Sequence, residues 1–421
     1  MIKTAAICAL KGTITRYLKR NLNVSEYQVA GQHKNKKWLN HHWLGFQLSI
    51  LLVLFLLSGV VAVLKAPLTA VFMPTQTQVP SDKPIPWTHL ESELAKHYPR
   101  LQIYAVTLPK EPYLAAKATL MQAKSEHQGA RKVEVFFDRA TATILDEQHQ
   151  ENWLDKASRF HRNVTAQRSL STWALVSAPL WLAVIIMSVY QYRHRLTRLW
   201  RVNNQHVSKT HAWLMAWLLP LSLMIALSAS WFFAERILWQ HNVAVYPNLP
   251  KSDGTVSDVA LPLSDLMARV EQVAPDANIR FAGYPSSPTG TFSVLLQSSQ
   301  PWVYYRAHQL HFNAFTGELI HVVLPDDVEG LAWWADLMRF IHYGETPWLM
   351  WMFALSGVVL AMAICFASWR YLSKIKRQAG VAVFLTVISL NGVVFGLAVY
   401  GLYQLSEDMP YRGWPVVSPV L

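Results

Sequence analysis

Long blocks of apolar residues alternate with long polar blocks along the chain. Five of the apolar blocks have the length of a membrane helix, because a hydrocarbon core of about 30 Å is crossed by about 20 helical residues. No lysine or arginine falls inside any of the five blocks. The pattern therefore predicts an integral membrane protein with spans at residues 43–64, 171–192, 212–233, 348–369 and 381–402.

Basic residues predict the direction of the spans. The segments 1–42, 193–211 and 370–380 are rich in lysine and arginine and contain a single acid, Glu26. Short segments of this kind stay on the cytoplasmic side of a membrane. We therefore expect a cytoplasmic N-terminus and an external C-terminal tail at residues 403–421. The formal net charge of +12 requires no nucleic-acid partner, because anionic membrane lipid attracts the same basic surface.

The second half of the chain repeats the first at an offset of about 170 to 180 residues, and such a repeat indicates duplicated architecture. Each half reads as a span, a polar segment and a second span. The polar segments 65–170 and 234–347 are predicted to lie outside, each with one amphipathic helix followed by strand-like runs. The predicted fold is an α-helical membrane bundle with two external α+β domains. The clearest matches set His41, Trp43, Leu44 and Ser58 against His211, Trp213, Leu214 and Ser228.

Four histidines stand near the polar ends of four spans. His41 and His211 open spans at the cytoplasmic side, whereas His161 and His342 precede spans that begin outside. Each membrane face thus receives one histidine from each repeat. Neutral imidazole binds iron well, and helix bundles often build cofactor sites from side chains on facing helices. The pattern predicts axial ligands for two haem b groups, one near each face.

Other readings of the histidines stay open. His42 adjoins His41 and is an alternative ligand, although the repeat register favours His41. All four could instead be interfacial residues beside tryptophans at the ends of helices. Among the remaining histidines, His308 and His311 are three apart and point to opposite faces of a regular strand. A metal site with the nearby His321 would therefore require a bulge. The chain's two cysteines, Cys8 and Cys365, predict no disulfide.

Short motifs lie at or near three of the four histidines, His41, His161 and His342, and one more closes the second external segment. Together they resemble the PepSY-domain transmembrane proteins, whose bacterial members include inner-membrane ferric-siderophore reductases. The sequence departs from the family pattern at Ala212, where arginine is expected, and at Ala229, where glycine is expected. The motifs are Leu-Asn-His-His-Trp-Leu-Gly at 39–45, Ser58-Gly59, Arg159-Phe160-His161-Arg162, Ile341-His342-Tyr343-Gly344 and the turn from Phe312 to Leu319.

The resemblance implies a haem-b reductase in the bacterial inner membrane that passes electrons to a periplasmic acceptor, a ferric chelate such as a siderophore complex. No Gly-x-Gly-x-x-Gly fingerprint follows a predicted strand, so the expected donor is a cytoplasmic reductase or a membrane quinol. The alternative is a non-enzymatic PepSY membrane protein that binds a peptide, a protease or a metal complex. A transporter ranks last, because the spans lack charged clusters near the midplane.

Overall fold

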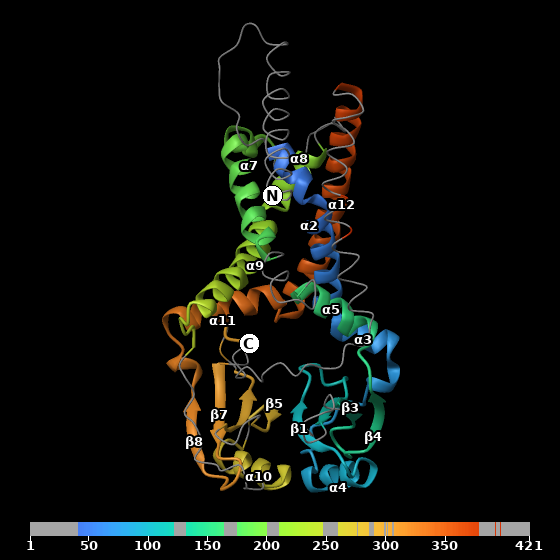
Figure 1. The fold of residues 1–421 in the computed structure, drawn as a ribbon, viewed down its shortest axis with the longest axis vertical. Helices are drawn as coiled ribbons and strands as arrows, with labels where there is room; N and C mark the ends of the chain where they lie inside the picture. The colour runs from blue at the N-terminus through green and yellow to red at the C-terminus, as the bar shows by residue number, and fades with distance from the viewer. Residues whose placement is uncertain are drawn as a thin grey trace, which may run out of the picture. The chain divides into compact units, whose positions relative to one another are not determined.

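The computed structural model describes residues 41–121, 132–163, 175–199, 210–246, 260–275, 277–285, 290–298, 300, 302–304, 307–378, 392 and 396. For 41–44, 195–199, 210–212 and 374–378 it describes the backbone alone. The helices and strands within these ranges are shown in Figure 1.

Four long helices form the apolar part of the molecule: α2 His41–Val63, α7 Ser177–Leu199, α9 Leu219–Gln240 and α12 Pro347–Gln378. They pack around a shared core because each contributes buried apolar side chains to it. Burying a leucine or isoleucine side chain contributes about 1.5–3 kcal/mol. The core consists of Leu52, Leu56, Trp181, Ile185, Ala226, Leu360 and Ala361.

The prediction of five membrane spans is corrected. Among the helices that the structure describes, three are long and apolar enough to cross a membrane, at Gly45–Val63, Leu219–Gln240 and Pro347–Ser373. Helix α7 does not join them, because its apolar part ends just before Arg193 and its described part begins later than the predicted residue 171. The predicted span at 381–402 lies outside the described residues, apart from positions 392 and 396.

The predicted span at 212–233 is divided in the structure. A short helix, α8 Thr210–Trp217, precedes α9, and the two meet at Leu218. Pro220 lies at the start of α9, where a residue without a backbone N–H is tolerated. The membrane-length helix consequently runs on to Gln240, beyond the predicted end.

The prediction of two separate external α+β domains is also corrected. All strands that the structure describes belong to one antiparallel sheet of eight, in the order β4-β3-β2-β1-β5-β6-β7-β8. The two modules join where β1 pairs with β5, with Val106 opposite Ala282. A four-stranded half would leave unpaired backbone groups along that edge, and pairing satisfies them. The strands are β1 Gln102–Thr107, β2 Ala116–Met121, β3 Lys132–Phe137, β4 Ile144–Gln148, β5 Ile279–Gly283, β6 Phe292–Leu296, β7 His308–Phe312 and β8 Leu319–Val323.

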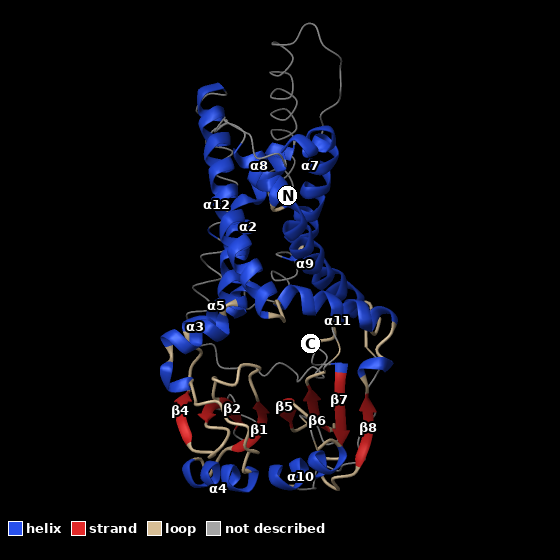
Figure 2. Ribbon diagram, turned by 180° about the vertical axis from the view of Figure 1, so that it is seen from behind, coloured by secondary structure: helices blue, strands red, loops and turns tan. Residues whose placement is uncertain are grey.

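One face of the sheet packs against two short helices, α4 Trp87–His97 and α10 Leu263–Val273 (Figure 2). Alternating strand residues point to that face, as the two-residue period of a strand requires. The burial of β3 follows this alternation, with Val133, Val135 and Phe137 in the core. The opposite face is free to carry polar groups and to border a site.

Two further helices lead from the ends of the two half-sheets to the long helices. Helix α5 Trp153–Asn163 follows β4 and contacts α2, and α11 Gly330–Tyr343 follows β8 and contacts α9. Helix α11 ends at Gly344, whose φ of 63° is left-handed. A side chain there would be strained by the backbone and would crowd Met350, at 3.0 Å from its Cα. Glycine therefore ends α11 two residues after His342.

Candidate functional site

The last turns of α5 and α11 bring two of the predicted histidines together. The ring centres of His161 and His342 are 5.9 Å apart, and the ring planes differ by 23°. One histidine comes from each repeat, which is the pairing that a pseudo-twofold arrangement predicts for the outer face. Their role as ligands stays a prediction.

The ring of His161 is held by helix α2. Its Nδ1 lies 3.1 Å from the carbonyl oxygen of Phe55 and 3.3 Å from Ser58 Oγ. The Ser58 hydroxyl donates its own hydrogen to the carbonyl of Leu54, at 2.7 Å. A carbonyl oxygen can only accept a hydrogen bond. Nδ1 of His161 therefore carries the hydrogen.

The ring of His342 is held in the same manner by helix α9. Its Nδ1 lies 3.1 Å from Ser228 Oγ, and Ser228 donates to the carbonyl of Met224 at 2.8 Å. The serine hydrogen is thus used one turn back along the helix, which leaves the oxygen to accept. Ser58 and Ser228 occupy matching positions in the two repeats, so both contacts belong to one duplicated design.

Both imidazoles are neutral near pH 7. Burial lowers the pKa of His161 to about 4, partly offset by its bond to the Phe55 carbonyl, and the nearby charge of Arg162 lowers it further. Burial and the neighbouring His161 lower the pKa of His342 to about 3. With the hydrogen on Nδ1, each Nε2 keeps its electron pair. Neither Nε2 has a hydrogen-bond partner among the described residues.

A cavity of about 630 Å³ adjoins the two rings, within the range of roughly 300–1,000 Å³ that is usual for ligand sites. Its wall includes the helices around the histidines. Phe281 and Leu295 line it from the face of the sheet opposite α4 and α10. Gly59 leaves space for the ring of His161, because a Cβ at this position would lie 2.9 Å from its Cε1. The remaining lining residues are Phe55, Leu56, Val60, Ala62, Val63, Lys65, Ser158, Arg162, Ile225, Tyr304, Tyr343, Phe353 and Gly357.

The residues of this site fit a haem. Two neutral imidazoles, one from each repeat and with ring centres 5.9 Å apart, would hold the iron, and the largely apolar cavity beside them would take the porphyrin. A hydrogen-bonded Nδ1 is also the usual feature of a metal-bound histidine.

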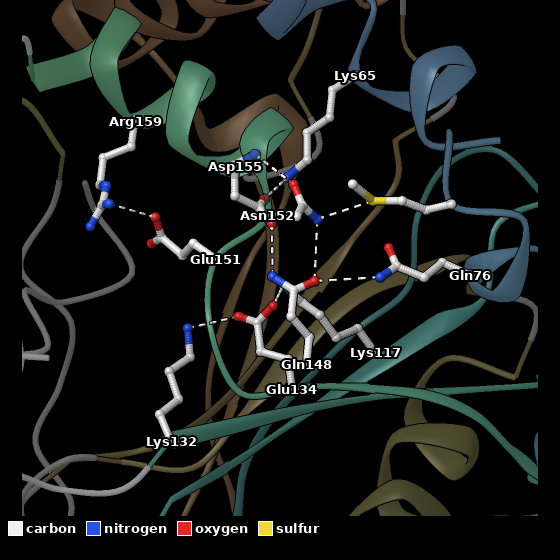
Figure 3. Close-up of polar contacts among 11 residues, drawn as sticks. Lys65, Gln76, Lys117, Lys132, Glu134, Gln148, Glu151, Asn152, Asp155 and Arg159 are labelled. Atoms are coloured by element: carbon white, nitrogen blue, oxygen red, sulfur yellow. Dashed lines mark hydrogen bonds and ion pairs between the residues drawn. The ribbon is translucent and has the colours of Figure 1, made fainter. Parts of the chain in front are cut away.

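A network of polar side chains fixes helix α5, and with it His161 (Figure 3). Asp155 forms an ion pair with Lys65 and accepts a hydrogen bond of 3.2 Å from Gln148. Burial alone would raise the pKa of Asp155, but the positive charge of Lys65 holds it below its usual value. Arg159 on the same helix pairs with Glu151 at 2.9 Å. These contacts tie α5 to the start of helix α3 Lys65–Phe72 and to strand β4.

A second network lies behind His342, and sequence reasoning missed it. Phe232 contacts His342 edge-on, with ring centres 4.9 Å apart. The guanidinium of Arg339 lies 5.7 Å from the centre of the Phe232 ring and forms a buried ion pair with Glu235. Arg339 also donates to the Tyr246 hydroxyl at 2.8 Å. Glu235 was a detectable signal, because it is a lone acid inside an apolar helix.

The structure describes only the backbone of the predicted inner pair, His41 and His211. His41 begins α2 and His211 lies in α8, but their side chains, like that of His42, lie outside the described residues. The inner haem therefore stays a prediction.

The three histidines of the second half-sheet, His308, His311 and His321, do not form a metal site within the described ranges, where no group of three such ligands occurs. His311 and His321 face each other across β7 and β8, with ring centres 6.2 Å apart. Both ring nitrogens of His311 are hydrogen-bonded, at 3.0 Å each to Ser293 and Gln309. His308 is opposite Leu296 and so points to the other face.

The family model of the PepSY-associated TM region matches residues 38–374, which include all four predicted ligands. The chain belongs to this family. Comparison with curated protein sequences gives no match. The family assignment confirms the resemblance drawn from the histidine motifs and agrees with a membrane-spanning PepSY protein.

Proposed function

We propose that this PepSY-associated membrane protein is a haem-b reductase of the bacterial inner membrane that delivers electrons to a periplasmic ferric chelate. The observation that carries the proposal is the duplicated serine–histidine contact. It gives two neutral imidazoles with their Nε2 electron pairs available and their ring centres 5.9 Å apart.

A haem held by His161 and His342 would supply reversible one-electron transfer. The surrounding residues set the conditions for that chemistry. Ser58 and Ser228 hold the rings in a ligating orientation, and hydrogen bonds of this kind also influence the potential of a bound metal. Phe55 and Phe232 cover the rings edge-on, which limits the approach of water.

The cavity supports a proposed acceptor site beside the sheet. The outer histidines line the cavity together with Phe281 and Leu295 from the sheet, so an acceptor that contacts the external module would come close to the outer site. We further propose that His41 and His211 hold a second haem nearer the cytoplasm. Electrons would reach that haem from a cytoplasmic reductase or from quinol.

The orientation in the membrane belongs to the same proposal. The basic segments place the N-terminus inside, and the sheet would then be periplasmic. Reporter fusions after Gln150 and Asp326 should read periplasmic, and a fusion after Arg201 should read cytoplasmic. A cytoplasmic signal at either of the first two sites would overturn the direction of electron transfer.

Absorption spectra of the full-length protein, purified after growth with haem, provide the central test. We expect reduced-minus-oxidised bands of haem b and a stoichiometry of two per chain. His161→Ala and His342→Ala should each remove one haem and abolish reduction of an external ferric chelate. His321→Ala is the matched control, because this exposed histidine should leave haem content unchanged.

Two results would contradict the proposal. A folded, haem-supplied protein without haem bands would favour the non-enzymatic binding function. Two haems retained in both His161→Ala and His342→Ala would show that these histidines serve structure alone.

A further inference from the structure

We infer that Lys65, Ser158 and Arg162 form a carboxylate-binding wall of the cavity, and that this wall holds the propionate groups of the porphyrin. The inference rests on the proposed haem function and specifies which edge of the cofactor faces helix α5. All three residues line the cavity beside His161.

Arg162 supplies the main charge of the wall. It follows His161 directly on α5, is exposed and lines the cavity. It has no ion pair or hydrogen bond with any residue that the structure describes. A guanidinium binds a carboxylate through two parallel hydrogen bonds. Arg162 is therefore available to a ligand that brings its own negative charge.

Ser158 supplies a neutral donor. Its Oγ is buried and has no hydrogen-bond partner among the described residues. A buried hydroxyl without a partner costs free energy, so a ligand atom at this point would satisfy it. Ser158 and Arg162 are four residues apart on one helix, and such residues lie on the same face. The hydroxyl and the guanidinium can thus approach one ligand from the same side.

Lys65 completes the wall from the start of α3. Asp155 holds its ammonium group by an ion pair, which places a charged donor at the cavity without fully enclosing it. The lysine side chain keeps 43% of its surface exposed. Among the cavity-lining residues that the structure describes, there is no aspartate or glutamate. The wall therefore favours a ligand with acidic groups.

The apolar remainder of the cavity indicates what those acidic groups are attached to. Phe55, Leu56, Val60, Ile225 and Phe353 line the cavity around the histidines. A ligand with a broad apolar body, a metal centre and acidic groups on one edge matches the whole lining. Iron protoporphyrin has this distribution.

The experiment compares iron protoporphyrin with its dimethyl ester, in which both propionates are uncharged. Full-length protein is loaded with either form, and transfer of haem to an excess of apomyoglobin is followed by absorbance. The outer haem is the phase that is absent from His161→Ala. Arg162→Gln should release protoporphyrin from this phase roughly tenfold faster or more, and Ser158→Ala should give a smaller acceleration in the same direction.

Release of the dimethyl ester should be the same in wild type and Arg162→Gln, because no carboxylate remains to be lost. Arg162→Lys should restore part of the retention. Lys156→Gln is the matched control, since it removes an equal charge from the same helix at a position that does not line the cavity. Thermal melting of each variant tests that the fold is retained.

The outcomes separate this inference from the proposed function. If Arg162→Gln releases protoporphyrin at the wild-type rate, or accelerates the ester equally, the carboxylate-binding wall is wrong while haem binding stands. If the wild type binds neither porphyrin, the proposed function itself fails.

Discussion

The two repeats hold their histidines by the same hydroxyl contact but anchor the supporting helices differently. In the first repeat, α5 is tied down by Lys65 and Asp155, whose side chains keep 43% and 19% of their surface exposed. In the second, α11 is tied down by Glu235 and Arg339, which keep 7% and 3%. The two repeats thus share the serine–histidine contact and differ in the charges that anchor the helix behind it. The solvated side leaves Arg162 and Lys65 accessible to a ligand, whereas the buried side places its charges in the protein interior.

The largest expected effect comes from breaking the buried pair. Arg339→Met leaves Glu235 without its partner in the interior, which should lower the free energy of unfolding by about 3–5 kcal/mol. Lys65→Met in the first repeat should cost about 1 kcal/mol or less, because that pair is partly solvated. Denaturant unfolding of the purified variants measures both. Adding Glu235→Gln to Arg339→Met should recover part of the loss, and equal costs for the two single variants would remove the proposed difference between the repeats.

The next effect concerns the two serines. Ser228→Ala removes the one partner that the described residues give to Nδ1 of His342, whereas Ser58→Ala leaves His161 its bond to the Phe55 carbonyl. Loss of such an orienting bond typically weakens metal binding about 10- to 100-fold. Haem release from Ser228→Ala should therefore accelerate within that range, and from Ser58→Ala less.

A shift in the midpoint potential of the outer haem should accompany the serine changes, measured by redox titration. Threonine at either position keeps a hydroxyl and should restore retention and potential. If Ser58→Ala proves the more damaging variant, the Phe55 carbonyl does not hold the ring as the distances indicate.

A smaller loss of stability is expected from replacing Gly59, the residue that follows Ser58. Gly59→Ala would make the first repeat resemble the second, which has Ala229. Its new Cβ would lie 2.9 Å from His161, and overpacking of this kind costs about 1–3 kcal/mol. Gly45→Ala is the control, because no atom lies within 4 Å of the Cβ it would add. Thermal melting should fall for Gly59→Ala alone, and an unchanged melt would show that the ring can move aside.

The smallest effect is a pH dependence of the unfolding free energy that comes from His311 in the second half-sheet. Burial and the facing His321 lower the pKa of His311 to about 4, from an ordinary value of 6.5. The unfolded chain therefore takes up the proton first as the pH falls below 6.5, and stability declines from there towards pH 4. The loss from this residue between pH 7 and 5.5 should be about 1 kcal/mol.

Comparison of the wild type with His311→Gln measures the contribution of this position. The difference in unfolding free energy should shrink as the pH falls from 7 to 5. A difference that is constant with pH would mean that His311 is not kept neutral by the fold.

The sequence alone determined the features that depend on residues close to one another along the chain. Apolar length identified the membrane character, because the bilayer thickness fixes the number of residues in a span. The repeat identified His161, His342, Ser58 and Ser228 as matched positions before any contact was known. Family motifs around the histidines were sufficient for the family assignment, which the match to residues 38–374 confirms.

Only the tertiary structure decided which separated residues meet. Ser58 and His161 are 103 residues apart in sequence, and Ser228 and His342 are 114 apart, so no local pattern could pair them. The joining of the half-sheets through β1 and β5 likewise depends on two edges coming together. Hydropathy and periodicity report each segment's own burial, whereas the tautomer of a histidine, the partner of Glu235 and the unmet hydroxyl of Ser158 are properties of what packs beside them.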